Sequence, residues 1–270
     1  MTRIAFQGEE GAYSQEAIMQ AFGNDVETIA CQTFLDIFRA VNDARADFGM
    51  VPIENSTAGA INQAYDLLLD YDLKITREVI LRVRHALMTL PGIAQSEIKR
   101  VYSHPQALAQ CERYIANNNW EAIAAYDTAG AAKQLAEARE PNAAVIASLI
   151  AAHRYGLDIL ARDVQDITYN FTRFFVVGRA EPPRAEKSKT SLVFAARHTP
   201  GALYECLGEF ATRGINLTKL ESRPDRKLPW HYVFYLDFEG HWNDERCRDA
   251  LVGLLIKTSF LKVLGSYPAA

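Results

Sequence analysis

Signatures of metal, cofactor and membrane-spanning sites are absent from this sequence. No apolar run approaches the roughly 20 residues that a membrane-spanning helix requires, and residues 1–6 enter a strand pattern without a signal segment. The six histidines are scattered, and there is no His-x-x-x-His pair, aspartate-rich loop, Walker pattern or Gly-x-Ser-x-Gly turn. We therefore expect no metal, no cofactor and no membrane partner.

Excess basic charge and paired cysteines are lacking too. The chain has 29 Lys and Arg against 33 Asp and Glu, a net charge of −4, so there is no basic field to attract nucleic acid. Cys31, Cys111, Cys206 and Cys247 form no Cys-x-x-Cys pair and lie in apolar patterns, which predicts reduced, buried thiols in a cytoplasmic protein. The length of 270 residues and the 49% hydrophobic share predict a globular chain of two or three compact units.

Residues 1–180 alternate short apolar strands with amphipathic helices. Helix 33–45, for example, places Phe34, Ile37 and Phe38 on one face. This alternation predicts an α/β fold with largely parallel sheets. Two longer extended segments, near 73–89 and 160–177, predict crossings between two lobes, and a cleft between lobes is where ligands of such folds collect.

A change in pattern follows residue 180. Residues 181–189 carry prolines and charges without an apolar period, which predicts a linker. Residues 190–270 then follow the order β-α-β-β-α-β of an α+β, ferredoxin-like unit. Its strands are predicted at 191–195, 215–222, 230–238 and 261–267, and its helices at 201–213 and 244–257.

Polar side chains collect in the turns after two predicted strands. Asn55, Ser56 and Thr57 stand in a row before a glycine, and because an ordinary helix cap needs only one such residue, the row favours a functional site. Ser103 follows another strand, and Gln110 lies within two helical turns of it. The intervening histidine, 104, is interpreted as a capping or packing residue.

Two further turns contain glycine. Gly8 and Gly11 free the backbone to approach a ligand, and Ser14 is placed to cap the next helix. The turn does not read Gly-x-Gly-x-x-Gly, so a dinucleotide site is not indicated. Asp127 and Thr128 are interpreted as a helix cap followed by a small-residue packing face.

The most informative stretch is residues 170–175, where Thr172 and Arg173 stand at the mouth of a buried strand. Taken alone, the pair fits an ordinary strand end, since Thr suits strands and Arg often lies at a sheet edge. Asn170 and the polar turns described above favour a functional site over an ordinary strand end. Small hydroxyl and amide groups, together with helix N-termini, are suited to holding an anion.

These segments together resemble the prephenate dehydratase family, and the resemblance covers nearly the whole chain. The matching blocks, in order, are 51–56 (VPIENS), 103–111 (SHPQALAQC), 170–174 (NFTRF), 200–203 (PGAL), 216–224 (NLTKLESRP), Trp230 and 237–241 (DFEGH). Departures are Gly11-Ala12-Tyr13-Ser14, where the family usually has Gly-Thr-Phe-Ser, and Thr57-Ala58-Gly59 in place of Leu-Glu-Gly.

The resemblance implies decarboxylative dehydration of prephenate to phenylpyruvate in phenylalanine biosynthesis. It implies a catalytic domain over residues 1–180, with two lobes similar to type II periplasmic binding proteins, and the monofunctional form of the enzyme. Thr172 would donate a hydrogen bond to the leaving oxygen, and Arg173 would bind a substrate carboxylate. The remaining substrate hydrogen bonds would come from Asn55, Ser56, Ser103 and Gln110, with the role of Glu54 left open.

Residues 190–270 are similar to the regulatory ACT domain of that family. The similarity implies feedback inhibition by phenylalanine and a homodimer or homotetramer, with the effector at a subunit interface. The expected effector site combines the start of the first helix with the end of the adjoining strand, namely Gly201, Ala202, Leu203, Glu221, Ser222, Arg223 and Pro224.

Two alternatives stay open. Arogenate dehydratase performs the same chemistry on an aminated substrate. A non-catalytic sensor would combine the binding-protein-like lobes with an amino-acid-binding domain, but a plain receptor needs Arg173 and not Thr172, which favours an enzyme.

Overall fold

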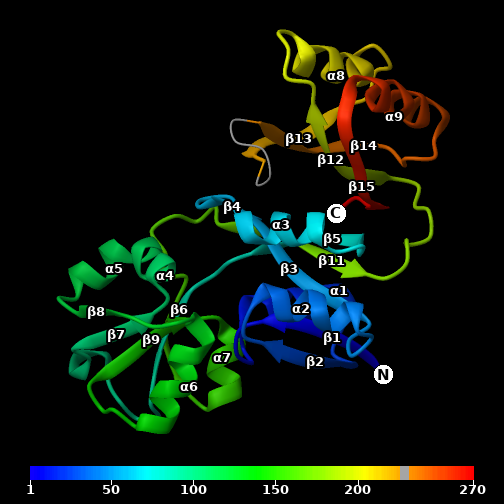
Figure 1. Ribbon diagram of the computed structural model, residues 1–270. Helices are drawn as coiled ribbons and strands as arrows, with labels where there is room; N and C mark the ends of the chain where they lie inside the picture. The colour runs from blue at the N-terminus through cyan, green and yellow to red at the C-terminus, as the bar shows by residue number, and fades with distance from the viewer. Residues whose placement is uncertain (226–230) are drawn as a thin grey trace. The chain divides into compact units, whose positions relative to one another are not determined.

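The computed structural model describes residues 1–225 and 231–270, and the chain divides into two compact units (Figure 1). The first unit comprises Met1–Ala64 and Val79–Phe174, and the second comprises Tyr65–Glu78 and Phe175–Ala270. Two strands, β5 (Lys74–Arg82) and β11 (Phe171–Gly178), contribute residues to both units. The predicted division into residues 1–180, 181–189 and 190–270 stays a prediction.

The N-terminal lobe is built on a sheet of order β2-β1-β3-β11-β5, with β4 paired to β3. Strand β1 is parallel to both β2 and β3, in agreement with the predicted α/β pattern. The other elements are β1 (Thr2–Gln7), α1 (Tyr13–Phe22), β2 (Val26–Cys31), α2 (Phe34–Asn42), β3 (Phe48–Asn55), β4 (Gly59–Ala60) and α3 (Asn62–Asp70).

The middle lobe, residues 86–162, is built on a second sheet of order β10-β6-β9-β7-β8. The chain enters it after β5 through residues 83–85 and leaves it for β11 through residues 163–170. Its elements are β6 (Ala86–Thr89), η1 (Gln95–Glu97), β7 (Arg100–Ser103), α4 (Pro105–Gln110), α5 (Glu112–Asn117), β8 (Glu121–Ala124), α6 (Thr128–Ala138), β9 (Ala143–Ala147), α7 (Leu149–Tyr155) and β10 (Asp158–Arg162).

Local sequence explains why these elements form where they do. In α2, Thr33 caps the helix in a reciprocal capping box with Asp36, and the predicted apolar face of Phe34, Ile37 and Phe38 is buried. In the middle lobe, every residue of β9 is buried, because its alternate side chains pack against α6 and α7 on one face and against α4 and α5 on the other.

The second unit contains the predicted β-α-β-β-α-β order, and its antiparallel sheet has the strand order β13-β14-β12-β15. Both helices pack on one face, around a core that includes Phe194, Phe210 and Phe238 (Figure 1). Trp230, the predicted start of the third strand, lies outside the described residues. The elements are β12 (Ser188–Ala196), α8 (Ala202–Ala211), β13 (Leu217–Pro224), β14 (Tyr232–Glu239), α9 (Glu245–Lys257) and β15 (Thr258–Pro268).

Residues 65–78 belong to the second unit through specific polar contacts. The carboxylate of Glu78 is fully buried and accepts hydrogen bonds from Lys189 Nζ at 2.8 Å and from the backbone N–H of Ala270 at 3.0 Å. Lys262 Nζ donates to the carbonyls of residues 68, 69 and 71 at the end of α3. A cation there satisfies carbonyls that the helix itself leaves without partners.

All four cysteines are free thiols. Cys111, Cys206 and Cys247 are buried as predicted, whereas Cys31, at the end of β2, is only half-buried. Burial raises the pKa of the Cys111 thiol to about 12, so this group stays protonated and unreactive. Among the described residues, no helix is both long and apolar enough to cross a membrane.

The glycine turn between β1 and α1 contacts the middle lobe. A Cβ added to Gly11, which has φ +91°, would lie 2.8 Å from the Cα of Ala151 in α7. Ser148 Oγ and Tyr155 hydroxyl donate to the backbone carbonyls of Gly11 and Glu10. Gly11 was expected to admit a ligand, but it instead admits the backbone of α7. Ser14 likewise does not cap α1, because it lies inside the helix, whose N-cap is Ala12.

We predict that Gly11→Ala separates the two lobes at this point. The new methyl group meets backbone and the residue must also hold a left-handed conformation, so the free energy of unfolding should fall by about 2–5 kcal/mol. Gly23→Ala is the matched control, because Gly23 has φ +76° with nothing within 4 Å of the added Cβ. Its ψ of −168° is also open almost only to glycine, so this variant should cost about 1–3 kcal/mol, less than Gly11→Ala, which adds the collision with α7. Urea unfolding measures both, and equal losses would show that the lobe contact contributes nothing.

Candidate active site

A cavity of about 220 Å³ in the first unit is lined by residues from both lobes. Tyr13 and Asn55 come from the N-terminal lobe, and Gln110 comes from α4 of the middle lobe. The segments that connect the lobes contribute His85 and Asn170. Thr172 in β11 and Phe174, two residues further along the strand, complete this wall. The predicted cleft between lobes therefore exists, and its polar lining is mainly amide and hydroxyl.

Asn55, the last residue of β3, makes more hydrogen bonds than any ordinary strand end requires. Its Oδ1 accepts from the backbone N–H groups of Thr57 (3.0 Å) and Ala58 (3.1 Å) and from the hydroxyl of Thr57 (2.6 Å). Its Nδ2 donates to Asn170 Oδ1 at 2.8 Å and to Thr172 Oγ at 2.9 Å. The amide is buried, so it holds the turn after β3 against the start of β11.

Thr172 faces the cavity from β11 with only 9% of its surface exposed. Its hydroxyl oxygen accepts the hydrogen bond from Asn55. No acceptor for the hydroxyl proton of Thr172 is found among the residues that the structure describes. The proton is therefore available to a ligand in the cavity.

A second chain of hydrogen bonds leads from Asn170 to the far side of the cavity. Asn170 Nδ2 donates to Gln110 Oε1 at 2.9 Å, and His85 Nε2 lies 2.8 Å from the same oxygen. The other ring nitrogen of His85, Nδ1, lies 2.6 Å from the hydroxyl of Tyr13. Gln110 Nε2 donates to Thr57 Oγ at 2.8 Å, which returns the chain to the turn after β3.

The two ionisable side chains in this series of hydrogen bonds, His85 and Tyr13, are neutral at pH 7. Burial lowers the pKa of His85, and the hydrogen bond with Gln110 offsets only part of this effect. Burial, with smaller contributions from the charge of Glu16 and from Cys111, raises the pKa of the Tyr13 hydroxyl well above its usual value.

The structure separates the six predicted catalytic and substrate-binding residues into two groups. Asn55, Gln110 and Thr172 line the cavity and belong to one hydrogen-bond network. The other three do not line it. Ser56 Oγ accepts from the N–H of Phe171 at 2.9 Å, and so supports the start of β11 from the exposed side.

Ser103 and Arg173 do not line the cavity either. Ser103 is fully buried at the end of β7 and donates to the carbonyl of Ile146 in the neighbouring strand at 2.6 Å. Arg173 alternates with Thr172 and Phe174 along β11, so its side chain leaves the opposite face of the sheet. Its role as a carboxylate ligand stays a prediction.

Sequence reasoning missed His85 and did not select Tyr13 or Asn170 as site residues. His85 ends a stretch in which apolar and charged residues alternate, which was interpreted as a plain crossing segment. Its burial to 2% exposure depends on contacts with α1 and α4 that no local pattern announces. Asn170 stands next to the Thr-Arg pair, and that adjacency was the available signal.

Two predicted caps are confirmed. His104 is the N-cap of α4, with Pro105 in the first turn, and its Nδ1 accepts from the N–H of Gln106. Asp127 caps α6 by accepting from the N–H of Gly130. The described residues contain no group of three or more His, Cys, Asp or Glu side chains arranged to hold a metal ion.

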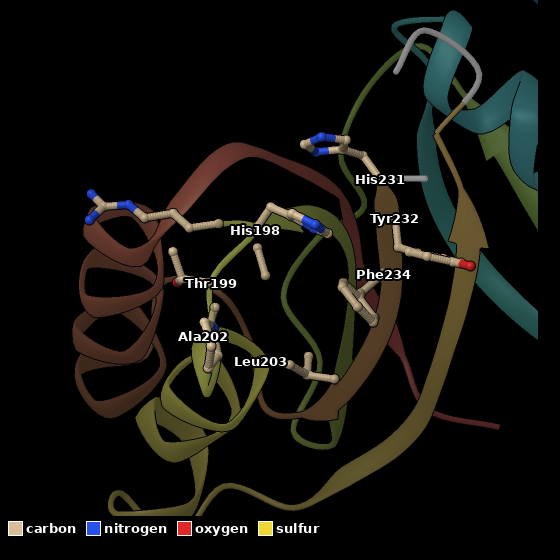
Figure 2. A pocket seen from close by; sticks show the side chains of 10 residues that line it. His198, Thr199, Ala202, Leu203, His231, Tyr232 and Phe234 are labelled. Carbon is tan, nitrogen blue, oxygen red and sulfur yellow. The ribbon is translucent and has the colours of Figure 1, made fainter. Parts of the chain in front are cut away.

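A second cavity, of about 350 Å³, lies in the second unit (Figure 2). It is bounded by Thr199, Ala202 and Leu203 where β12 leads into α8, by Phe234 of β14, and by His231, which directly precedes that strand. Gly201 has φ +81° and is the N-cap of α8. The predicted helix-start half of the effector site therefore lies at a cavity.

The strand half of the predicted effector site lies beside this cavity and does not line it. Ser222 in β13 pairs directly with Phe234 of β14, so the two side chains share a sheet face. Arg223 points to the other face, where it pairs with Asp66 at 3.1 Å. The carboxylate of Glu221 forms a salt bridge with Lys219 Nζ at 3.0 Å, and Pro224 is the last residue of the strand.

Comparison with known proteins identifies the family. The family model for prephenate dehydratase matches residues 4–182, and the chain belongs to this family. A curated relative from Arabidopsis thaliana, "Arogenate dehydratase/prephenate dehydratase 1, chloroplastic", is 44% identical over 98% of this chain and 72% of its own length. The chain is therefore a dehydratase, a carbon–oxygen lyase.

Solved structures agree over the full length of the chain. The prephenate dehydratase of Arthrobacter aurescens in complex with L-Phe is 37% identical, with a TM-score of 0.91 over 100% of this chain and 90% of that one. A structure described as "GqqA- a novel type of quorum quenching acylases" is 38% identical, with a TM-score of 0.92 over 99% of this chain and 98% of that one.

The position of Ser103 leads to a test of its role. Ser103→Ala should lower the free energy of unfolding by about 1–2 kcal/mol, because the carbonyl of Ile146 loses its side-chain donor inside a buried sheet. KM should stay within about twofold, since the hydroxyl is directed into the sheet. Steady-state kinetics and urea unfolding measure both quantities, and a large rise in KM with unchanged stability would return Ser103 to the substrate ligands.

Proposed function

We propose that the chain converts prephenate to phenylpyruvate, with loss of carbon dioxide and water, and that phenylalanine inhibits it. The observation that carries the catalytic part is the hydroxyl of Thr172. Its oxygen is held by Asn55 inside a cavity, and no described residue takes its proton. Family membership supports the choice of substrate.

The chemistry requires little beyond orientation and help for the leaving hydroxide, which takes up a proton from solvent to become water. Aromatisation of the ring supplies the driving force. A threonine hydroxyl titrates far above neutral pH, so Thr172 acts as a hydrogen-bond donor to the departing oxygen and not as a proton store. Fixed donors that meet developing negative charge stabilise the transition state of other enzymes by about 3 kcal/mol each. The amide of Asn55 raises the donor strength of Thr172 by binding its oxygen.

Arogenate is the second candidate substrate, and one side chain favours it. Asp127 lines the cavity, and its Oδ2 is buried without a hydrogen-bond partner in the described part of the chain. The ammonium of an aminated substrate would satisfy that oxygen, whereas a dianion gains nothing from it. Purified enzyme supplied with prephenate or with arogenate, with phenylpyruvate and phenylalanine followed as products, decides between the two. Asp127→Asn keeps the helix cap and should raise KM only for arogenate.

An acylase activity, as named for the similar structure GqqA, would need an activated nucleophile. His85 is bonded to Tyr13 and Gln110, and His104 caps its own helix. Within residues 1–225 and 231–270, no serine, threonine or cysteine is hydrogen-bonded to either ring. The geometry therefore favours the dehydratase.

We predict that Thr172→Ala lowers kcat at least about 100-fold while KM changes little, because the lost donor acts in the transition state. Thr172→Ser keeps the donor and should retain more activity. Thr76→Ala is the matched control: Thr76 is also buried in the sheet, and it donates to Val176 O at 3.1 Å. It should lose stability and keep kcat. A Thr172→Ala enzyme within fivefold of wild type would remove Thr172 from catalysis.

For regulation, we propose that residues 190–270 form an ACT domain linked through residues 181–189 to a catalytic domain over residues 1–180. The carboxylate of phenylalanine would bind at the N-terminus of α8 and its ring near Leu203, in the cavity of Figure 2. Because Ser222 and its neighbours lie off this cavity, they would complete the site of a second copy of the chain, in a homodimer or homotetramer.

Alanine substitutions at two glycines, both with positive φ, test this site. Gly201→Ala should weaken phenylalanine inhibition at least tenfold, because φ +81° at the N-cap no longer suits the residue and the start of α8 shifts. Gly214→Ala is the matched control. Gly214 has φ +63° and, like Gly201, nothing within 4 Å of an added Cβ, but it follows the C-terminal end of α8. It should leave inhibition unchanged. Equal inhibition constants for both variants and wild type would place the effector elsewhere.

A further inference from the structure

In the hydrogen-bond network of the first cavity, the donor and the acceptor of each bond can be assigned, starting from the end at Asn55. At one end, the N–H groups of Thr57 and Ala58 can only donate, so the group of Asn55 that faces them must be its carbonyl oxygen. The Nδ2 of Asn55 therefore faces Asn170 and Thr172. This orientation leaves the hydroxyl proton of Thr172 unused.

The same direction continues through two more amides. Because Asn170 accepts from Asn55 with its oxygen, its Nδ2 must face Gln110. Gln110 accepts with Oε1, so its Nε2 faces Thr57. The nitrogen of His85 that lies 2.8 Å from Gln110 Oε1 must then carry a proton. A lone pair at that position would face another lone pair.

At the other end, the Tyr13 hydroxyl has two acceptors within reach, His85 Nδ1 at 2.6 Å and the carbonyl of Arg84 at 3.1 Å. Because a neutral imidazole with its proton on Nε2 presents a lone pair at Nδ1, the closer of the two, the hydroxyl donates to Nδ1. The backbone N–H of His85 donates to Gln165 at 2.8 Å, and the ring packs edge-on against Tyr13 with centroids 5.5 Å apart. The ring therefore has a fixed orientation as well as a fixed partner.

We propose that Tyr13 and His85 are positioning residues of the reaction. The direction that the backbone imposes on Asn55 requires the Nε2–H form of His85, and the Tyr13 hydroxyl stabilises this form by donating to Nδ1. The amides of Gln110 and Asn170, which lie between, are then held in one orientation at the cavity wall. As far as it concerns catalysis by Thr172, this inference rests on the function proposed above.

The other neutral tautomer of His85 would disrupt the hydrogen bond to Gln110 in the middle of the network. With the proton on Nδ1, the lone pair of Nε2 would oppose Gln110 Oε1, and Gln110 would turn or move away. Asn170 and Thr57 would each lose a partner, while Asn55 stayed fixed by the backbone. The expected result is a looser wall beside Thr172 in a protein that still folds. Burial of His85 and Tyr13, which keeps both rings neutral, supports the assignment.

The test combines ring NMR with kinetics on the full chain. In ¹⁵N-labelled protein at pH 7, the His85 ring, assigned by its loss in His85→Gln, should show a protonated Nε2 and an unprotonated Nδ1. Tyr13→Phe should shift His85 toward a mixture of the two forms. It should also lower kcat about tenfold and leave KM within about threefold, because it changes the orientation of the hydrogen-bond donors at the cavity wall and leaves the volume of the cavity unchanged.

Two further variants separate positioning from stability. Tyr155→Phe removes another hydroxyl that bridges the lobes, through its bond to Glu10 O at 2.8 Å, but it lies outside this network. It should cost similar stability without moving the His85 signals or kcat. His85→Gln offers an amide donor near the position of Nε2 and should retain several times the kcat of His85→Leu.

A protonated Nδ1 in the wild-type ring, or a Tyr13→Phe enzyme with unchanged kcat and unchanged His85 signals, would overturn the proposal. If the wild-type enzyme turned over neither prephenate nor arogenate, the proposed function would fail. The ring signals would still decide whether Tyr13 sets the form of His85.

Discussion

One carboxamide, that of Asn55, holds the parts of the site together. It closes the turn after β3 through its oxygen and fixes Asn170 and Thr172 through its nitrogen. Because the group is buried, water cannot replace a lost partner, and an unmatched amide there costs about 1–3 kcal/mol. The position of Thr172 relative to the cavity therefore follows from the end of a different strand, and not from β11 alone.

The two lobes of the first unit meet through a close backbone approach and through hydrogen bonds. Gly11 meets α7 by backbone approach, and Gln110 reaches His85 and Asn170 by hydrogen bonds. Hydrogen bonds depend on angle and distance far more steeply than apolar contact does. A site assembled this way holds its donors in defined directions, which suits a reaction that needs orientation more than added chemical groups.

Much of the fold could be predicted because its causes are local. The apolar face of α2, the caps of α4 and α6 and the element order of the second unit all follow from spacing and turn chemistry. The site was harder. Thr172 and Arg173 are neighbours in sequence, but strand alternation directs them to opposite faces. The burial of His85 and the contact of Gly11 with α7 arise between residues far apart in the chain, and no local pattern encodes them.

The contacts of residues 65–78 limit how far this protein is modular. This segment precedes the middle lobe in sequence, yet Glu78 is neutralised by Lys189 and capped by the N–H of Ala270, and Lys262 closes the end of α3. A chain cut after residue 180 would retain the buried carboxylate and lose its ion pair with Lys189, and removing one partner of a buried ion pair typically destabilises a fold by about 3–5 kcal/mol. Residues 175–270 are thus structural partners of residues 65–78, which include the start of β5. Gene fusion or domain exchange at the apparent linker would have to replace those contacts as well as join the chains.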